Sequence, residues 1–350
     1  MSTPFITVAS VSKRFDPQLS LGDHIAGALG GAVETRAVRA VQDVSLELVR
    51  GEVLGLVGES GCGKSTLGRM IAGILPPTAG AVAIDGAPVM VGRRPARKRT
   101  TRVQMIFQDP YASLDPRMRV GDALAEGPVV HRLVTRPEAP AYVAGWLRKV
   151  GLDADAAQRY PHQFSGGQRQ RIAIARALAM RPDVLVCDEP VASLDVSIQA
   201  QVLNLFLALR QELALTMVFI SHHLGVVRHV SDRVAIMYLG RIVEIGSADA
   251  IYSNPQHPYT RALLQSVPQL TLADDVVTSF KPIDGELPSP LAPPPGCAFH
   301  QRCPFAEPRC RQQVPALRHI GPQHDAACHL LAPSPRESGE REGPARSAGG

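Results

Sequence analysis

A glycine-rich segment at residues 58–66 has the composition of a phosphate-binding loop. It fits the pattern G-x-x-x-x-G-K-[ST] throughout. Glycines let backbone N–H groups approach an anion closely, a lysine can reach the terminal phosphates of a nucleotide, and the serine after it can bind Mg²⁺. The segment therefore predicts the nucleotide-binding residues Gly58, Glu59, Ser60, Gly61, Cys62, Gly63, Lys64, Ser65 and Thr66.

The residues on either side of this loop have the patterns that such a site needs. Residues 53–57 form a short apolar run, which predicts a buried parallel strand. After the loop, apolar residues recur at helical spacing through Leu67, Met70, Ile71, Ile74 and Leu75. A strand, a glycine loop and a helix in this order place a helix N-terminus, with its partial positive charge, at the phosphates.

Two adjacent carboxylates follow a second apolar run. Residues 184–187 predict another buried strand, and Asp188 and Glu189 come directly after it. Ligands bind at the carboxyl ends of parallel strands in sheets of this kind. Asp188 can hold Mg²⁺ there, and Glu189 can orient and polarise an attacking water. Downstream of a phosphate loop, this pair indicates phosphoryl transfer.

A second anion-binding helix start lies between these motifs. Ser165 precedes a helical pattern as an N-cap would, and the glycines after it let backbone approach an anion. A second phosphate site for the same nucleotide would be redundant, so this one is better explained by another nucleotide.

With this segment included, the sequence resembles the ATP-binding cassette (ABC) ATPases. The matching motifs follow the family's order over about residues 5–245. Gln108 matches the Q-loop, Asp195 the D-loop and His222 the switch histidine. The family's signature motif is matched by Ser165, Gly166, Gly167 and Gln168.

The resemblance implies an α/β fold with a parallel core sheet, an antiparallel subdomain and a helical subdomain at about residues 109–180. It also implies a head-to-tail dimer, in which ATP lies between the phosphate loop of one cassette and the signature helix of the other. Ser165 and Gly167 would then serve the partner's nucleotide.

The resemblance also implies roles for the site residues. Lys64 and Mg²⁺ neutralise the β- and γ-phosphates, and Glu189 acts as general base. His222 holds the γ-phosphate and the water in line, while Gln108 contacts Mg²⁺ and the water. The Mg²⁺ ligands are Ser65, Gln108 and Asp188. The chain departs from the family at His223, where Asp is usual, and reads Ala-Ser at residues 192–193, where Ser-Ala is commoner.

The adenine contact has two interpretations. Phe15 is the best match to the aromatic residue that stacks on the base in this family. A segment rich in Gly and Ala separates it from the next strand-like residues. Phe15 is therefore either the stacking residue or a core residue of an edge strand.

Composition limits the class of protein. A length of 350 residues allows one large domain and a smaller one. Neither an apolar run of 18 residues nor a signal-peptide pattern is present, which predicts a cytoplasmic location. The net charge of +5 is modest. The basic cluster at residues 93–102 lacks interleaved aromatics, so a solvated face is expected there and no nucleic-acid partner.

The last hundred residues resemble one branch of the family, the ATPase subunits of dipeptide and oligopeptide importers. The resemblance rests on residues 254–264 and 285–290 and, upstream, on residues 65–69 and 108–116, which resemble the F-type of the two ATPase subunits. This implies two transmembrane permeases, a second related ATPase in a heterodimer, an extracytoplasmic solute-binding protein, and a place on the cytoplasmic face of the inner membrane. The sequence does not identify the transported solute: a peptide, a nickel chelate, glutathione and an opine-like compound all remain open.

Other kinds of ABC protein fit less well. The alternative is a soluble ABC ATPase that acts on ribosomes or nucleic acid. The sequence shows no second cassette and no long charged heptad region, which argues against that alternative.

Four cysteines cluster near the C-terminus, at Cys297, Cys303, Cys310 and Cys328. Disulfides are disfavoured in a cytosolic chain, so metal ligation is the leading interpretation. The spacing is wider than in a typical zinc-binding pair and suits an iron–sulfur cluster better than zinc. Reduced, packed thiols are the third possibility. The predicted domains are a cassette at 1–255, a C-terminal domain at 256–333 and a disordered tail at 334–350.

Overall fold

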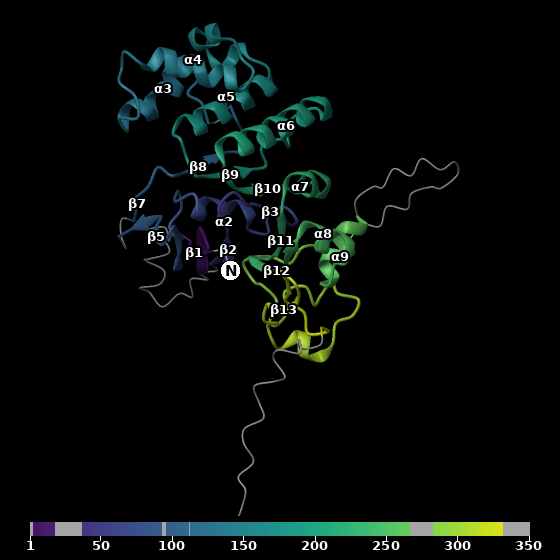
Figure 1. The fold of residues 1–350 in the computed structure, drawn as a ribbon. Coiled ribbons are helices and arrows are strands. Elements are labelled where there is room, and N and C mark those ends of the chain that lie inside the picture. The colour runs from purple at the N-terminus through teal and green to yellow at the C-terminus, as the bar shows by residue number, and fades with distance from the viewer. Residues whose placement is uncertain (1–2, 18–36, 93–95, 112, 267–282, 332–350) are drawn as a thin grey trace, which may run out of the picture.

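The computed structural model describes residues 3–17, 37–92, 96–111, 113–266 and 283–331. Figure 1 shows three regions along the molecule: a helical region with α3, α4 and α5, a central region of sheets, and a C-terminal region beside α9 and β12. The predicted tail at residues 334–350 lies outside the described residues.

The core sheet has eight strands in the order β13-β14-β12-β11-β3-β10-β9-β8. Five of them form a parallel run, as predicted. These are β8 (Val103–Ile106), β9 (Val184–Asp188), β10 (Thr216–Ile220), β3 (Val53–Val57) and β11 (Arg233–Tyr238). Every residue of β3, β9 and β10 is buried, which explains why their sequences are continuous apolar runs without alternation.

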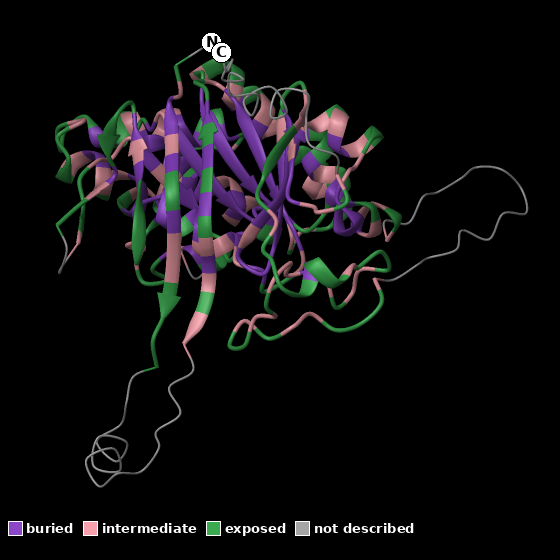
Figure 2. Ribbon diagram, turned by 90° about the horizontal axis from the view of Figure 1, so that it is seen from below, coloured by how far each residue is buried: buried purple, intermediate pink, exposed green. Residues whose placement is uncertain are grey.

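Both faces of this parallel run are covered. Val53 and Val57 of β3 pack into one apolar cluster with side chains of α5 (Gly166–Ala179), α6 (Val196–Leu213) and α7 (Leu224–Val230). Leu54 and Leu56 pack into a second cluster, with α2 (Lys64–Ile71) and the antiparallel sheet. The buried central strands stand out in Figure 2. This layered core fixes the strand ends at which the functional residues lie.

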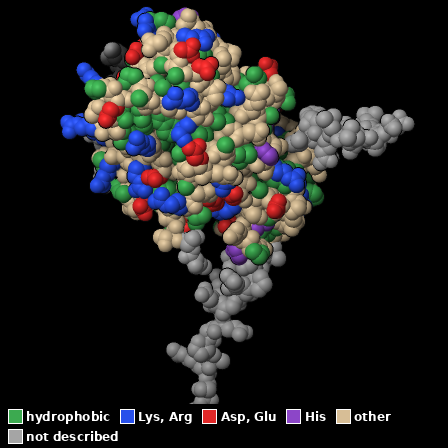
Figure 3. All heavy atoms as spheres, turned by 45° about the horizontal axis from the view of Figure 1, so that its top comes forward, with side chains coloured by type: hydrophobic (Ala, Val, Ile, Leu, Met, Phe, Trp, Pro, Cys, Tyr) green, Lys and Arg blue, Asp and Glu red, His purple; other side chains and the backbone are tan. Residues whose placement is uncertain are grey.

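The antiparallel sheet has the order β2-β1-β4-β5. Its strands are β1 (Ile6–Phe15), β2 (Val38–Leu48), β4 (Ala79–Ile84) and β5 (Ala87–Pro88). A short hairpin of β6 (Met90–Val91) and β7 (Arg97–Lys98) follows. The positive charges of the chain lie among negative ones. In the basic cluster, the described Arg102 pairs with Asp183 at 2.5 Å. Figure 3 shows Lys and Arg interspersed with Asp and Glu over one face of the molecule.

The helical region lies between β8 and β9 in the chain. It contains α3 (Val120–Val130), α4 (Ala139–Lys149), the 3₁₀ turns η1 (Ala154–Gln158) and η2 (Pro161–Gln163), and α5. Trp146, Leu147 and Val143 of α4 are buried in the same cluster as α5. The region therefore packs as a unit that presents the N-terminus of α5.

The helix after the phosphate loop is shorter than the sequence predicted. Ile74 and Leu75 continue the apolar spacing, but α2 ends at Ile71. Gly73 adopts a φ of 68°, in the left-handed region that ends a helix, and Ile74 is 47% exposed. The helical spacing of these last two residues was coincidental.

The chain after β11 turns back along the sheet. β12 (Arg241–Ser247) pairs antiparallel with β11, followed by α8 (Ala248–Ser253) and α9 (Pro258–Gln265). Residues 283–331, here called the C-terminal module, contain η3 (Pro308–Arg311), β13 (Arg318–Gly321) and β14 (His324–Ala326). Because β14 pairs with β12, the C-terminal module extends the core sheet by two strands.

A buried carboxylate joins the C-terminal module to the cassette. Glu244 of β12 is fully buried, and its Oε1 lies 2.7 Å from Nε2 of His324 on β14. Its two oxygens also accept the backbone N–H groups of Gln256 and His257, at 2.7 and 2.9 Å. Burial opposes ionisation, but these hydrogen bonds outweigh it and lower the pKa of Glu244.

No helix in the described part of the chain has both the length and the apolar composition needed to cross a bilayer.

Candidate functional site

The phosphate loop joins β3 to α2. Lys64 is 4% exposed, and its Nζ donates hydrogen bonds to the carbonyl oxygens of Gly58 and Glu59 at 2.8 and 3.0 Å. Gly63 has a φ of 108°, and a Cβ there would lie 2.2 Å from the carbonyl oxygen of Ala40. The pattern therefore needs glycine at this position for both conformation and space.

A pair of oxygens suited to Mg²⁺ lies beside the loop. The hydroxyl of Ser65, in the first turn of α2, donates to Oδ1 of Asp188 at 2.8 Å, at the end of β9. Burial raises the pKa of Asp188, opposed by the Ser65 hydrogen bond and by the charge of Arg69. Hydroxyl and carboxylate oxygens are the ligands that Mg²⁺ prefers, so this pair fits the cation.

The side chains of Gln108, Glu189 and His222 come from three separate strand ends and meet at the Glu189 carboxylate. Oε2 of Glu189 accepts a hydrogen bond from Nε2 of Gln108 at 3.2 Å, and it lies 3.2 Å from Nδ1 of His222. Gln108 follows β8, Glu189 follows β9 and His222 follows β10. Neighbouring parallel strands thus bring together residues far apart in sequence.

The backbone at Glu189 is strained. Its φ is 46°, in the left-handed region that non-glycine residues rarely adopt, at a cost of roughly 1 to 3 kcal/mol. The N–H of Glu189 donates to the carbonyl oxygen of Ile220 at 2.9 Å, which holds this conformation. The turn aims a side chain that is only 14% exposed toward Gln108 and His222.

A cavity of about 630 Å³ connects these groups. Its volume lies in the ordinary range for small-molecule sites. Lys64, Ser65, Gln108, Glu189 and His222 all line it. The remaining walls come from Phe15, Val38, Arg39, Ala40, residues 60–63, Thr66, Leu239, Gly240 and Pro290.

Phe15 lies at the end of β1, at the rim of this cavity. The residue is 42% exposed, and Nζ of Lys13 lies 5.1 Å from the centroid of its ring. A core residue of an edge strand would be buried, so the exposed position agrees better with the stacking interpretation.

The signature residues lie at the start of α5, away from this cavity. Ser165 caps the helix in a capping box with Gln168, and both Ser165 and Gly166 are exposed. Asp195 precedes α6 and is exposed as well. None of these residues, all within the described ranges, lines the cavity of its own chain.

The six cysteines, all in described segments, are free thiols. Cys62 and Cys187 are buried beside the nucleotide motifs, and burial raises the pKa of both. Cys297 donates its backbone N–H to the carbonyl oxygen of Cys310 at 2.8 Å, which ties two of the C-terminal cysteines together. Burial and the neighbouring thiols raise the pKa of Cys297 to about 11.

Over residues 3–331, less the undescribed gaps, no group of three or more His, Cys, Asp or Glu is arranged to hold a metal ion. The zinc and iron–sulfur predictions for the C-terminal cysteines therefore find no support in that arrangement.

Two contacts to the phosphate loop were missed by sequence reasoning. The hydroxyl of Tyr259 on α9 accepts the backbone N–H of Glu59 at 2.9 Å. Nη1 of Arg302 in the C-terminal module lies 3.0 Å from both carboxylate oxygens of Glu59. The run His-Pro-Tyr-Thr at 257–260 was a usable signal for the first contact, whereas nothing in the sequence marks the second.

The fold and the site together define a P-loop ATPase cassette. A phosphate loop lies between β3 and α2, an acidic pair ends β9, and a helical region presents a second helix N-terminus. These parts share one parallel sheet.

Comparison with known proteins places the cassette in a family. Residues 41–192 match the ABC transporter family, and residues 243–310 match the oligopeptide/dipeptide transporter C-terminal region. The chain is 54% identical to the di/tripeptide transport ATP-binding protein DppF of Pseudomonas aeruginosa, over 83% of this chain and 90% of that protein. It is 49% identical to the oligopeptide transport ATP-binding protein AppF of Bacillus subtilis, over 84% and 90%.

A solved structure supports the same fold. The chain resembles cbiO1 of Clostridium perfringens, part of the ABC transporter complex cbiONQ, with a TM-score of 0.57 and 26% identity, covering 72% of this chain and 91% of that chain. The chain belongs to the ABC transporter ATP-binding proteins, in the branch that carries the oligopeptide/dipeptide transporter C-terminal region. It is an ATPase that uses ATP and Mg²⁺.

Proposed function

We propose that this chain powers the import of peptides or related small solutes through separate permease subunits. The observation that carries the proposal is the convergence of Gln108 and His222 on Glu189, beside the Ser65–Asp188 pair. These groups could activate a water and hold Mg²⁺, on a chain that also matches the oligopeptide/dipeptide transporter C-terminal region. The names of its relatives support peptides as the solute class.

The geometry suggests how each residue acts in hydrolysis. Lys64 turns from the carbonyl oxygens of Gly58 and Glu59 to the β- and γ-phosphates. Ser65 and Asp188 would hold Mg²⁺, which would supply positive charge beside the same phosphates. Gln108, which lines the same cavity, would contact both this ion and the attacking water.

Glu189 is the general base of the proposed mechanism. It accepts a proton from a water, whose oxygen attacks the γ-phosphorus while the bond to the β–γ bridging oxygen breaks and ADP leaves. His222, 3.2 Å from the Glu189 carboxylate, orients the water and the γ-phosphate. The strained turn at Glu189 supports this role, since such strain clusters at active sites.

We propose that the exposed N-terminus of α5 completes the nucleotide site of a second ATPase subunit. In this capped helix start, Ser165 and Gly166 are exposed, so a partner's γ-phosphate can approach them, while Gln168 is half-buried and Gly167 is buried. Asp195 is also exposed, and we propose that it contacts the second ATPase subunit as well. A related F-type and D-type pair would form the heterodimer.

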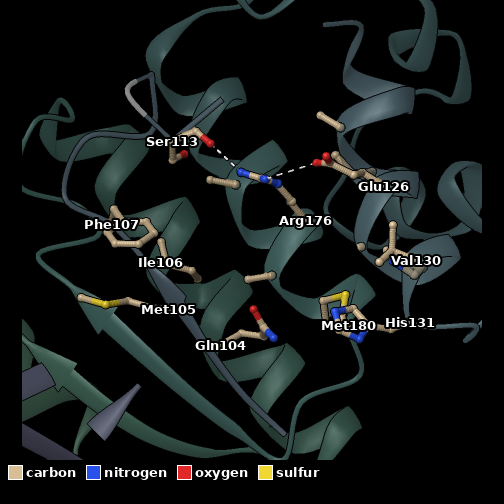
Figure 4. A pocket seen from close by; sticks show the side chains of 16 residues that line it. Gln104, Met105, Ile106, Phe107, Ser113, Glu126, Val130, His131, Arg176 and Met180 are labelled. Carbon is tan, nitrogen blue, oxygen red and sulfur yellow. Dashed lines mark hydrogen bonds and ion pairs between the residues drawn. The ribbon is translucent and has the colours of Figure 1, made fainter. Parts of the chain in front are cut away.

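A groove beside Gln108 is a suitable docking site for a permease. It has a volume of about 420 Å³ and lies between β8 and the helical region (Figure 4). Phe107, directly before Gln108, forms one side, and Val130, which is 70% exposed, forms the other. Arg176 between them donates to the carbonyl oxygen of Ser113 at 2.5 Å. Because Phe107 precedes Gln108, an occupant of the groove can shift a hydrolytic residue.

Placing a charge in this groove tests the partner proposal. Val130→Asp is expected to abolish co-purification of two multi-span permeases and a second ATPase from detergent-solubilised membranes, because a desolvated carboxylate opposes docking. ATP binding should be retained. Val314→Asp, at a half-exposed valine of the C-terminal module, is the matched control and should keep the partners. Recovery of ribosomal or DNA-processing proteins without permeases would instead favour the alternative of a soluble ABC ATPase.

The proposed function also implies a cellular location for the subunit and a division of the chain into domains. The subunit would bind peripherally at the cytoplasmic face of the inner membrane, and an extracytoplasmic solute-binding protein would deliver the solute. We propose a cassette at 1–255 and a C-terminal domain at 256–333. The match of residues 243–310 to the transporter C-terminal region supports a boundary near this position.

We propose that Cys297, Cys303, Cys310 and Cys328 hold an iron–sulfur cluster. The support is their mutual proximity: each of Cys297, Cys303 and Cys328 has its pKa raised first by burial and then by neighbouring C-terminal thiols. Each of these three sulfur atoms also accepts a hydrogen bond from the backbone N–H of the residue two positions later in the chain. These hydrogen bonds lower the thiol pKa, in opposition to burial, and so stabilise the thiolate form that binds metal. The spacing of the four cysteines along the chain is wider than in a typical zinc-binding pair, which favours a cluster over zinc.

Iron analysis tests the cluster. Anaerobically purified wild type should contain iron and labile sulfide, and Cys303→Ser should lose most of both, because one ligand is removed. Cys62→Ser, at a buried cysteine outside the module, should keep the wild-type iron content. Zinc in place of iron would favour the zinc interpretation, and wild type without either metal would leave reduced, packed thiols as the correct interpretation.

A further inference from the structure

The C-terminal module contacts the phosphate loop of its own chain through one charged pair. Arg302 is 6% exposed on its side chain, and its Nη1 lies 3.0 Å from both oxygens of Glu59. The two residues are 243 positions apart in the chain. Glu59 is the second residue of the phosphate loop, so this contact is made inside the nucleotide-binding motif.

Arg302 is itself held in place from several directions. Its Nε donates to the carbonyl oxygen of Asp284 at 3.0 Å, and its Nη1 lies 3.5 Å from the hydroxyl of Tyr238. Phe299, three residues earlier, is 2% exposed and packs edge-on against Tyr238, with ring centroids 5.3 Å apart. Tyr259 packs against the same two rings. The position of the Arg302 guanidinium is therefore fixed by these hydrogen bonds and by the packed aromatic rings beneath it.

Each polar group of Glu59 is used. Its backbone N–H donates to the Tyr259 hydroxyl at 2.9 Å, its carbonyl oxygen accepts from Lys64 at 3.0 Å, and its carboxylate binds Arg302. Burial raises the pKa of Tyr259, so its hydroxyl stays protonated. The start of the loop is thus fixed by α9 and by the C-terminal module together.

A carboxylate in a phosphate loop is electrostatically unfavourable for ATP. It carries the same sign as the polyphosphate and lies on the loop that must surround it. A buried guanidinium at hydrogen-bond distance offsets part of that charge and holds the carboxylate by a charge-assisted contact.

We propose that Arg302 is a positioning residue of the ATP site, which holds the phosphate loop in its binding shape through Glu59 and reduces the repulsion between this carboxylate and the nucleotide. A second contact points the same way, because Pro290, just before the C-terminal cysteines, lines the nucleotide cavity and accepts the N–H of Arg39 at 3.3 Å. The inference depends on ATP binding by the cassette and not on the transported solute.

Binding of MgATP to the full-length chain tests this role. Arg302→Ala is expected to weaken binding about tenfold, within the usual range for coupled sites. The loss should shrink at high salt, because screening reduces the repulsion from an unpaired Glu59. Arg302→Lys keeps a donor and a charge and should bind within about threefold of wild type. Arg309→Ala, at an arginine that pairs with Glu307 inside the module, is the matched control and should leave affinity unchanged.

A charge-neutralisation test separates this role from a purely structural one. Glu59→Gln keeps an oxygen for Arg302 but removes the negative charge, so it should bind ATP at least as tightly as wild type. The double variant Arg302→Ala with Glu59→Gln should recover the part of the lost affinity that comes from charge repulsion, but not the part that comes from the lost Arg302–Glu59 contact. Unchanged affinity in folded Arg302→Ala, a double variant as weak as Arg302→Ala, or weaker binding by Glu59→Gln would each overturn the proposal. If Arg302→Ala does not fold, as judged by its melting curve, the Glu59→Gln and Arg302→Lys affinities decide.

Discussion

Glu189→Gln is expected to lower ATP turnover by about a thousandfold, while ATP still binds. Glutamine keeps the size of the side chain and can still accept a hydrogen bond from Gln108, but its amide cannot take the proton from the attacking water. General-base catalysis contributes roughly 10²- to 10⁴-fold, so the loss should fall in that range. Phosphate release measures the turnover, and equilibrium binding of a fluorescent ATP analogue measures the affinity.

The matched control for this experiment is Glu212→Gln. Glu212 lies on α6 and pairs with Lys149 at the surface, so neutralising it should change neither turnover nor affinity. Turnover near the wild-type rate in Glu189→Gln would remove Glu189 from the role of base. A parallel loss of ATP affinity would indicate a binding role for this side chain instead.

Lys64→Ala is expected to weaken MgATP binding about a hundredfold. Lys64 is the buried cation of the loop, and without it the β- and γ-phosphates lose a charge-assisted hydrogen bond. A simple readout is the melting temperature, because ligand binding stabilises the folded state in proportion to ln(1 + [ligand]/Kd). MgATP should raise the melting temperature of wild type but not that of Lys64→Ala at the same concentration.

Lys149→Ala serves as the control for Lys64. Its ammonium group pairs with Glu212 at the surface, away from the cavity, so MgATP should stabilise this variant as much as wild type. An equal shift of the melting temperature in Lys64→Ala and wild type would contradict the assignment of Lys64 to the phosphates.

Local patterns predicted the centre of the fold well. The apolar run at 53–57 is strand β3 with the same bounds, and the run at 184–187 is β9 with Asp188 added. These predictions succeeded because a strand that is buried on both faces needs apolar side chains at nearly every position, and a short apolar run is easy to recognise. The family resemblance, confirmed by the relatives, added the roles implied for Gln108 and His222, which no local pattern gives.

Contacts over long sequence distances were the part that could not be predicted. The pairing of β14 with β12 and of Arg302 with Glu59 depends on how the C-terminal module folds back onto the cassette. A lone arginine between two cysteines has no local pattern that reveals its partner. The end of α2 was misjudged for a local reason, since Gly73 stops the helix although the apolar spacing continues.

Solute uptake by the reconstituted complex tests the central claim most directly. The complex that co-purifies with this chain would be placed in proteoliposomes, with ATP on the side of the ATPase and labelled di- and oligopeptides with the binding protein on the other. We predict ATP-dependent peptide uptake with wild type and none with Glu189→Gln. A complex that hydrolyses ATP but moves no peptide or related small solute would contradict the proposed function.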